Sequence, residues 1–389
     1  MPELDALRGI AVLMVLFFHG FYMATGAERF HGPIHWFLLA TAGGWMGVNL
    51  FFVLSGFLIT GILLDSRDKP DYYRNFYLRR ALRILPAYYG VLLVVLIAAR
   101  TGIVERNVSW AFVGLSFIYL TNVTGFFGVQ SQYTVLWSLA VEEHFYLLWP
   151  TVVRNFTRRA LPWICGFIIV GCPALRAFYF WRHYEYGSGY TWLVADGLAW
   201  GALLATLARG KLSSRSSMLG FGISCLAGTL ATVVLLVPFG IAHTGAFAGG
   251  VVRVSLINSF FAAVLTLVVV AGSGSWRAIF EHSGLKFFGD ISYGLYLIHM
   301  LAFDFVNHVL AKFGLQVSRT SGSLTLIFAR FAAGAALSIA IAYVSRWYFE
   351  ERFLTLRSKF APGRTATPPI KDSQVKDSQA AIFETEAAS

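Results

Sequence analysis

Charged residues and cysteines are scarce in this sequence. Only 13% of the 389 residues are charged, and three residues are cysteines, each inside an apolar run. An average soluble domain carries roughly 25% charged residues, so an ordinary soluble protein is excluded. A disordered chain is also excluded, because it would contain few apolar residues. Isolated cysteines provide neither a disulfide framework nor a paired metal motif, so no metal site is predicted.

Apolar residues take the place of the missing charges. They make up 57% of the chain, and the mean hydropathy is +0.63. A bilayer core of roughly 30 Å needs about 20 apolar residues per helix, and about ten segments meet this requirement. The sequence therefore predicts an all-α integral membrane protein with about ten transmembrane helices embedded in the lipid bilayer. The predicted spans are 7–25, 43–64, 86–104, 135–153, 161–180, 190–208, 218–239, 250–271, 287–310 and 324–348.

The positions of the basic residues predict the orientation. The net charge of +11 could indicate a nucleic-acid partner. With the N-terminus in the cytoplasm, however, most of the 31 Lys and Arg residues fall on the cytoplasmic side, as the positive-inside rule requires. An even number of spans then places both termini in the cytoplasm, and no nucleic-acid partner is needed. Two shorter apolar segments, 36–42 and 109–121, are interpreted as interfacial or re-entrant.

The composition changes near the C-terminus. Residues 1–356 are predicted to form one membrane domain, and residues 357–389, a mixture of Thr, Pro, Ser, Gln, Glu and Ala, a disordered cytoplasmic tail. The first apolar run lacks a convincing cleavage site, so we expect it to be retained as the first span. No long hydrophilic block indicates an additional soluble domain.

Ionisable side chains within predicted spans are costly in lipid and therefore mark functional candidates. His19 follows Arg8 by eleven positions, which places both on one helix face with His19 about 16 Å deeper. The same arithmetic predicts that polar residues of five spans share one depth near the bilayer centre. The other four lie about 18 to 20 Å from the cytoplasmic edge: Ser55, Glu142, Asp196 and His299.

A basic and aromatic stretch precedes the third span. Residues 72–86 are predicted to form an amphipathic helix that ends at Pro86. Arg79, Arg80 and Arg83 are three or four residues apart within it, so their guanidinium groups cluster on the helix surface. Guanidinium groups bind phosphates well, and this cluster is therefore a candidate phosphate contact.

Five motifs in this chain resemble those of the membrane-bound acyltransferase-3 family, and they occur in the family's order. One departure concerns the sixth span, where the family often has an arginine two residues before its aspartate. Val194 stands at that position before Asp196, which weakens any role for Asp196. The matching motifs are Arg-x10-His at 8–19, Phe-Phe-Val-Leu-Ser-Gly-Phe-Leu at 51–58, Arg-x-x-Arg at 80–83, Ser-Leu-x-x-Glu at 138–142 and Ser-Tyr-x-x-Tyr-Leu-x-His at 292–299.

The resemblance implies a membrane O-acyltransferase of the bacterial inner membrane. Its donor would be cytoplasmic acyl-CoA, usually acetyl-CoA, used as a substrate and not as a permanently bound cofactor. Its acceptor would be a hydroxyl of a cell-surface polysaccharide, glycolipid or glycoside; lipopolysaccharide and peptidoglycan both remain open, as do acyl chain length and oligomeric state. The hydrolase-like domain that some family members carry is not expected within these 389 residues.

The chemistry of acyl transfer suggests roles for the candidate residues. A neutral alcohol is a poor nucleophile, so we expect His19 to act as general base with Glu142 as its electrostatic partner. A covalent acyl-His19 intermediate is the second possibility. The residues expected to bind acyl-CoA or substrate are Arg8, Arg79, Arg80, Arg83, Ser55, Tyr296 and His299.

Two other functions compete with this interpretation. A proton-coupled membrane transporter could use the same buried His and Glu residues, but it would favour repeats or broken helices in both halves, which the sequence does not show. A catalytically inactive membrane scaffold or sensor is disfavoured because the motifs are intact.

Overall fold

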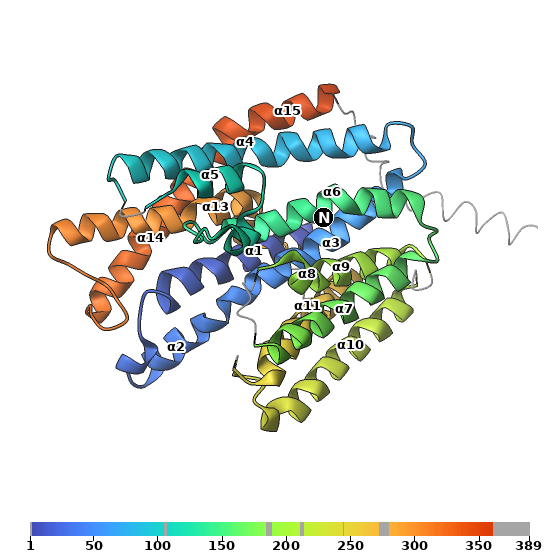
Figure 1. Cartoon of the computed structure of the whole chain (residues 1–389), viewed down its shortest axis with the longest axis horizontal. Helices are drawn as coiled ribbons and strands as arrows, with labels where there is room; N and C mark the ends of the chain where they lie inside the picture. Colours follow the sequence, from blue (N-terminus) through green and yellow to red (C-terminus); the bar gives the residue numbers. More distant parts are fainter. Residues whose placement is uncertain are drawn as a thin grey trace, which may run out of the picture.

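Helices form every regular element in the parts of the chain that the structure describes (Figure 1). This computed structural model confirms the predicted all-α class, and eight helical stretches are long and apolar enough to cross a membrane. The described residues are 2–104, 107–183, 189–210, 214–243, 245–271 and 280–360.

The eight stretches coincide with most of the predicted spans. They comprise α1 (Pro2–Phe17) with η1 (Phe18–Tyr22), α2 (Pro33–Thr41) with η3 (Ala42–Met46) and α3 (Gly47–Ser66), α4 (Tyr72–Arg100), α7 (Leu161–Trp181), α10 (Arg215–Leu236) with η5 (Val237–Phe239), η6 (Ala248–Val252) with α11 (Arg253–Ala271), α13 (Ser283–Lys312), and α14 (Leu324–Val344) with η7 (Ser345–Glu350) and α15 (Glu351–Phe360).

Helices also occupy the two remaining predicted spans, although neither is among the eight. They are α6 (Leu136–Asn155) and the pair α8 (Thr191–Val194) and α9 (Asp196–Ala208). The short segments η2 (Ala27–Arg29), α5 (Trp110–Phe117) and η4 (Thr121–Phe127) complete the set. The total of about ten spans and the cytoplasmic location of the termini stay predictions.

Two predicted boundaries are corrected. The amphipathic helix does not end at Pro86, because α4 continues through this residue to Arg100; membrane helices tolerate proline when neighbouring groups satisfy the freed backbone. Segment 36–42 is not separate from the second span, since α2 continues through η3 into α3. Helix α15 ends at Phe360, the rest of the predicted tail 357–389 lies outside the described residues, and the division into domain and tail stays a prediction.

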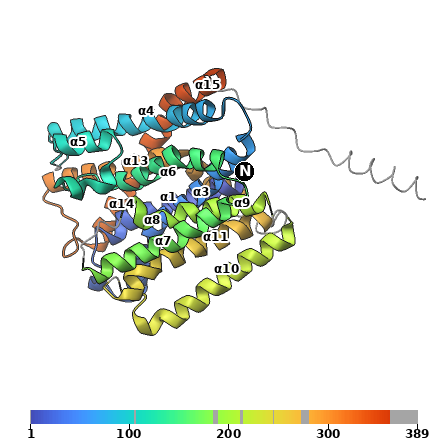
Figure 2. The same cartoon turned by 45° about the vertical axis from the view of Figure 1, so that its right-hand side comes forward.

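The helices form two groups around a shared centre. Figures 1 and 2 show α10 at one edge of the bundle and α4 with α15 at the opposite edge, with α1 and α3 between them. Helices α7, α9 and α11 lie on the α10 side, and α13 and α14 lie on the α4 side. The central pair therefore contacts both groups, and polar side chains on α1 and α3 can meet partners from either one.

Glycine contacts hold α1 against α13. A Cβ atom at Gly9 would lie 2.3 Å from the Leu285 carbonyl oxygen, and one at Gly289 would lie 2.1 Å from the Asp5 carbonyl oxygen. Only glycine permits such an approach, which is the usual way that membrane helices pack closely. His19 and His299 each follow their glycine by ten residues, so parallel packing from these contacts places both histidines at one level.

A second glycine contact holds α3 against α9. A Cβ atom at Gly56 would lie 2.0 Å from the Leu198 carbonyl oxygen. On another face of α3, the Trp149 Nε1–H of α6 donates to the Thr60 hydroxyl at 2.8 Å. These contacts fix α3 between α9 and α6, and they turn Ser55 towards α6.

Candidate active site

Two neighbouring cavities contain most of the predicted site residues. The first, named the arginine cavity, has a volume of about 100 Å³ and is lined by Arg8, Arg80, Arg83, Ser55 and Glu142 together with Ser138, Tyr146 and Tyr296. Helices α1, α3, α4, α6 and α13 all contribute to it. The structure thus assembles three predicted arginines with the predicted serine and glutamate.

Glu142 accepts hydrogen bonds from two hydroxyl groups in the arginine cavity. Ser55 donates to Oε1 at 2.7 Å, and Tyr146 donates to Oε2 at 3.2 Å. The Arg80 guanidinium carbon lies 5.1 Å from the centre of the Tyr146 ring, within range of a cation–π contact. The carboxylate is therefore held rigidly in the wall, close to a positive charge.

The arginines differ in position. Arg80 is partly buried and Arg83 is exposed, so one is held inside the cavity and the other faces outward. Arg8 donates to Asp5 at 3.0 Å. Arg79 does not line the cavity, although the sequence grouped it with Arg80 and Arg83.

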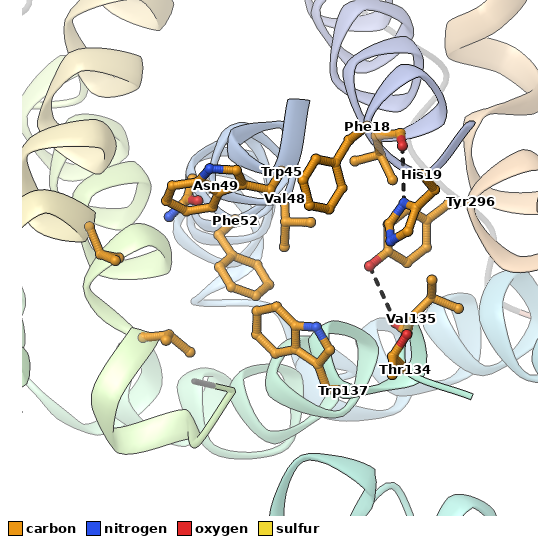
Figure 3. A pocket seen from close by; sticks show the side chains of 13 residues that line it. Phe18, His19, Trp45, Val48, Asn49, Phe52, Thr134, Val135, Trp137 and Tyr296 are labelled. Carbon is orange, nitrogen blue, oxygen red and sulfur yellow. Dashed lines mark hydrogen bonds between the residues drawn. The ribbon is translucent and has the colours of Figure 1, made fainter. Parts of the chain in front are cut away.

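The second cavity, named the histidine cavity, has a volume of about 280 Å³ and lies next to the first. Its polar lining includes His19, Asn49 and Thr134, and Trp45 and Trp137 are two of its aromatic walls (Figure 3). Both cavities share Val48, Phe52 and Tyr296. We refer to these three residues, which line both cavities, as the neck.

His19 forms a pair with His299. The Nε2 atom of His299 lies 3.2 Å from the Nδ1 atom of His19, which also lies 3.0 Å from the Val15 carbonyl oxygen. The Nδ1 atom of His299 lies 2.8 Å from the Tyr296 carbonyl oxygen. Carbonyl oxygens only accept, so in the neutral rings each Nδ1 carries the hydrogen. This assignment leaves the Nε2 atom of His19 with a free lone pair.

The surroundings of the two rings differ. His19 lies at the edge of the histidine cavity beside Tyr296, as Figure 3 shows. His299 is 1% exposed and lines neither cavity. His299 therefore contacts His19, whereas Tyr296 lines both cavities, and the substrate contact expected for His299 stays a prediction.

The predicted partnership of His19 and Glu142 is not a direct contact. Glu142 binds hydroxyl groups of Ser55 and Tyr146 in the arginine cavity, and His19 binds Val15 and His299 beside the other cavity. Helix arithmetic assigned similar depths to the two residues. It could not give the direction in which each helix faces, and that direction separates the two side chains.

Asp196 belongs to a different polar cluster. Its Oδ2 atom lies 3.0 Å from Arg176 and accepts from the Ser255 hydroxyl at 2.6 Å, whereas its Oδ1 atom has no hydrogen-bond partner among the described residues. Both charged side chains are almost fully buried, and neither lines either cavity. Arg176 of α7 thus supplies the positive charge that position 194 lacks.

Several lining residues were not predicted as site residues. Tyr146 follows Glu142 by four residues, and this spacing on a helix could have identified it as a partner. Trp137 precedes Ser138 within a recognised motif, which was a weaker signal. Trp45 lies in η3 and carries no signal in the sequence, because only the tertiary fold brings it to the histidine cavity.

Comparisons with known proteins identify the family. Residues 1–347 match the sequence model of a family described as an acyltransferase domain. The chain is similar to the peptidoglycan O-acetyltransferase OatA of Listeria monocytogenes, with 29% identity over 329 residues, which are 77% of this chain and 48% of that protein. The putative peptidoglycan O-acetyltransferase YrhL of Bacillus subtilis gives 29% identity over 330 residues, with 77% and 48% covered.

A putative O-acetyltransferase of Staphylococcus aureus extends this similarity. Its identity is 29% over 360 residues, which are 85% of this chain and 56% of that protein. The chain thus spans about half the length of the curated relatives it matches. No solved structure matches it. Because the family model covers most of the chain and the helices are apolar enough to cross a bilayer, this integral membrane protein belongs to that acyltransferase family.

Proposed function

We propose that this protein is an O-acetyltransferase of the bacterial plasma membrane. It takes an acyl group, preferably acetyl, from acyl-CoA on the cytoplasmic side and transfers it to a carbohydrate hydroxyl that enters from the other side. One observation carries the proposal: an arginine-lined cavity and a histidine-lined cavity are adjacent and share the lining residues Val48, Phe52 and Tyr296.

The arginine cavity suits the donor. CoA carries several phosphate charges, and guanidinium groups bind phosphate oxygens through charge-assisted hydrogen bonds. Arg8, Arg80 and Arg83 supply these groups at the cavity wall. The phosphates remain near the arginines, and the slender pantetheine arm carries the thioester towards the neck. Glu142 balances the positive charge and keeps Ser55 and Tyr146 in place.

The histidine cavity suits a sugar acceptor. Trp45 and Trp137 offer flat apolar faces against which the carbon–hydrogen faces of a pyranose ring can pack, and Asn49 and Thr134 offer hydrogen bonds to its hydroxyl groups. Ligand sites commonly combine apolar walls with a few polar groups that fix orientation. The named relatives suggest peptidoglycan as the first acceptor to test.

His19 is the general base of the proposed reaction. Its Nε2 lone pair removes the proton of the acceptor hydroxyl while the oxygen attacks the thioester carbon. The carbon–sulfur bond then breaks, and the CoA thiolate takes the proton from His19. The Nδ1–H of His19 is shared between the Val15 carbonyl oxygen at 3.0 Å and the Nε2 atom of His299 at 3.2 Å. Both acceptors stabilise the imidazolium, a task that a carboxylate performs in hydrolase triads.

The decisive experiment follows the acetyl group. Purified protein in phospholipid vesicles is incubated with acetyl-CoA labelled in the acetyl group and with peptidoglycan fragments or other glycans. We expect the label to appear on the glycan as an alkali-labile ester. Protein-free vesicles and CoA labelled in its nucleotide serve as controls. Passage of unchanged label across the vesicle membrane without ester formation would identify a transporter and overturn the proposal.

A further inference from the structure

The neck determines where the reacting carbonyl must lie. If the donor enters through the arginine cavity and the acceptor through the histidine cavity, their reacting atoms come together beside the residues that line both cavities. Tyr296 lines both cavities, and its hydroxyl lies 2.6 Å from the Ser138 hydroxyl. Two hydroxyl groups on different helices, α13 and α6, are therefore present at the meeting point.

These hydroxyl groups share a poor acceptor. The Val135 carbonyl oxygen lies 3.3 Å from the Tyr296 hydroxyl and 3.3 Å from the Ser138 hydroxyl. One of the two hydroxyl protons lies between the hydroxyl oxygens, and the other is directed to Val135. Because strong O–H···O bonds are about 2.5 to 3.0 Å long, the bond to Val135 is weak. Rotation about one C–O bond can redirect that proton to a better acceptor.

We propose that Tyr296 and Ser138 form the oxyanion-binding pair of this enzyme, with Tyr296 donating to the thioester carbonyl oxygen and Ser138 supporting it. The inference rests on the proposed function and names a catalytic contact for it. Both residues are buried, at 7% and 5% exposure, and hydrogen bonds to a developing charge are stronger where water is excluded.

The proposed acyl transfer needs no reactant other than the thioester, the acceptor hydroxyl and His19. The acceptor oxygen bonds to the carbonyl carbon, the hydroxyl proton moves to His19 Nε2, and the carbonyl electron pair moves to oxygen. The Tyr296 O–H stabilises that negative oxygen and keeps its own proton. Collapse of the intermediate restores the carbonyl, breaks the carbon–sulfur bond and releases the CoA thiolate, which takes the proton held by His19.

Removal of the Tyr296 hydroxyl tests the inference. We expect Tyr296→Phe to lower kcat about 100- to 1000-fold, the usual effect of losing one oxyanion donor, with the KM for acetyl-CoA changed less than about threefold. Ser138→Ala should lower kcat about tenfold, because the Tyr296 hydroxyl can still turn to the substrate. Equal kcat in Tyr296→Phe and in the unmodified protein would overturn the proposal.

Tyr133 provides the matched control. It is fully buried, its hydroxyl donates to the Leu297 carbonyl at 2.6 Å, and it lines neither cavity. Tyr133→Phe therefore removes one buried hydroxyl next to the same helix without reaching substrate. We expect its kcat to stay within about threefold of the unmodified protein, a change typical of one lost structural hydrogen bond. If kcat falls as much in Tyr133→Phe as in Tyr296→Phe, the loss in Tyr296→Phe reflects the removal of a buried hydroxyl and not the loss of an oxyanion contact, and the proposal is overturned.

Infrared spectroscopy separates this inference from the proposed function. Acetyl-CoA labelled with ¹³C at the carbonyl is bound to His19→Ala, which lacks the base and so preserves the thioester. We expect the carbonyl band at a lower frequency than that of free acetyl-CoA, and we expect Tyr296→Phe in the same background to remove most of this shift. An unshifted band would overturn the oxyanion role even if acetyl transfer is demonstrated. Absence of transfer by the unmodified protein would instead refute the proposed function.

Discussion

Two polar clusters inside the helix bundle differ in how their hydrogen-bonding groups are used. The His19–His299 pair directs its remaining lone pair to a cavity. The Arg176–Asp196 pair is buried, at 3% and 0% side-chain exposure, and lines neither cavity. Arg176 also donates to the Leu193 and Val251 carbonyl groups, so its donors are used within the protein.

The difference shows that burial of an ionisable residue in a membrane protein does not by itself indicate catalysis. Burying either cluster within the bilayer costs free energy, and both clusters contain residues to which the sequence assigned the same depth. A general base needs a lone pair that is available to substrate. A buried structural group instead needs hydrogen-bond partners for all of its polar atoms. His19 lines a cavity and so fits the first requirement under the proposed function, whereas Asp196 is held by Arg176 and Ser255 and lines neither cavity.

The largest expected effect is on His19. Replacing His19 by Ala removes the only proposed base, so kcat should fall by about 10²- to 10⁴-fold, the usual contribution of general base catalysis. The amount of protein in the membrane should stay the same, because the ring faces a cavity. Acetyl transfer per mole of purified protein measures the effect.

A histidine elsewhere on α13 is the control for this variant. His308 lies nine residues beyond His299 and lines neither of the two cavities. His308→Ala should keep at least half of the activity. Substantial turnover by His19→Ala would exclude His19 as the base. The two clusters would then no longer differ in catalytic role.

Replacement of Asp196 should lower the stability of the fold and leave catalysis almost unchanged, which is the opposite of the effect expected at His19. Asp196→Ala leaves Arg176 buried without its carboxylate, and breaking a buried pair costs about 3–5 kcal/mol of folding free energy. We expect a lower yield and a lower melting temperature, but kcat per folded molecule should change less than about threefold. Thermal unfolding in detergent and active-site titration measure the two quantities separately.

A double variant sharpens this test. Replacing both partners with apolar residues, as Arg176→Met together with Asp196→Leu, removes the unpaired charge and should recover much of the stability. If Asp196→Ala instead remains stable and loses activity, the cluster is functional and the comparison between the two clusters is wrong.

The sequence predicted the apolar helices well, and the depths assigned to the polar residues stay predictions. Apolar run length depends only on bilayer thickness, and the rise per residue is constant, so His19, Glu142 and Asp196 could be assigned depths from spacing alone. Depth is nevertheless one coordinate of three. Whether two residues touch depends on helix rotation and neighbour choice, which close contacts such as Gly9 with Leu285 determine.

The partners of the candidate residues were therefore the least predictable part. His299 was expected near substrate and lies behind His19, and Arg176 had no assigned role before it was found beside Asp196. Pro86 was expected to end a helix, but its neighbours in the bundle allow α4 to continue. In each case the missing information is long-range packing, which no local pattern contains.

A smaller effect is expected at the arginine cavity. Arg80→Ala with Arg83→Ala should raise the KM for acetyl-CoA about 10- to 100-fold, since each hydrogen bond to a charged group contributes about 1.5–3 kcal/mol and partial compensation by Arg8 is expected. The value of kcat at saturation should change little. Arg79→Ala is the control, because Arg79 neighbours the pair in sequence but does not line the cavity. An equal KM increase in Arg79→Ala would indicate a general loss of surface charge.

The smallest expected effect concerns Ser55, and it decides to which kind of cluster Glu142 belongs. Ser55→Ala removes the 2.7 Å hydrogen bond to Glu142 and leaves the 3.2 Å bond from Tyr146, a net loss of about 1 kcal/mol. We expect kcat to fall about fivefold with the melting temperature lowered by no more than about 2 °C, because the carboxylate in this cavity wall is held for the reaction. Ser55→Thr keeps the hydroxyl and should restore activity. A larger fall in melting temperature with unchanged kcat would place Glu142 with Asp196, as a carboxylate that serves the fold alone.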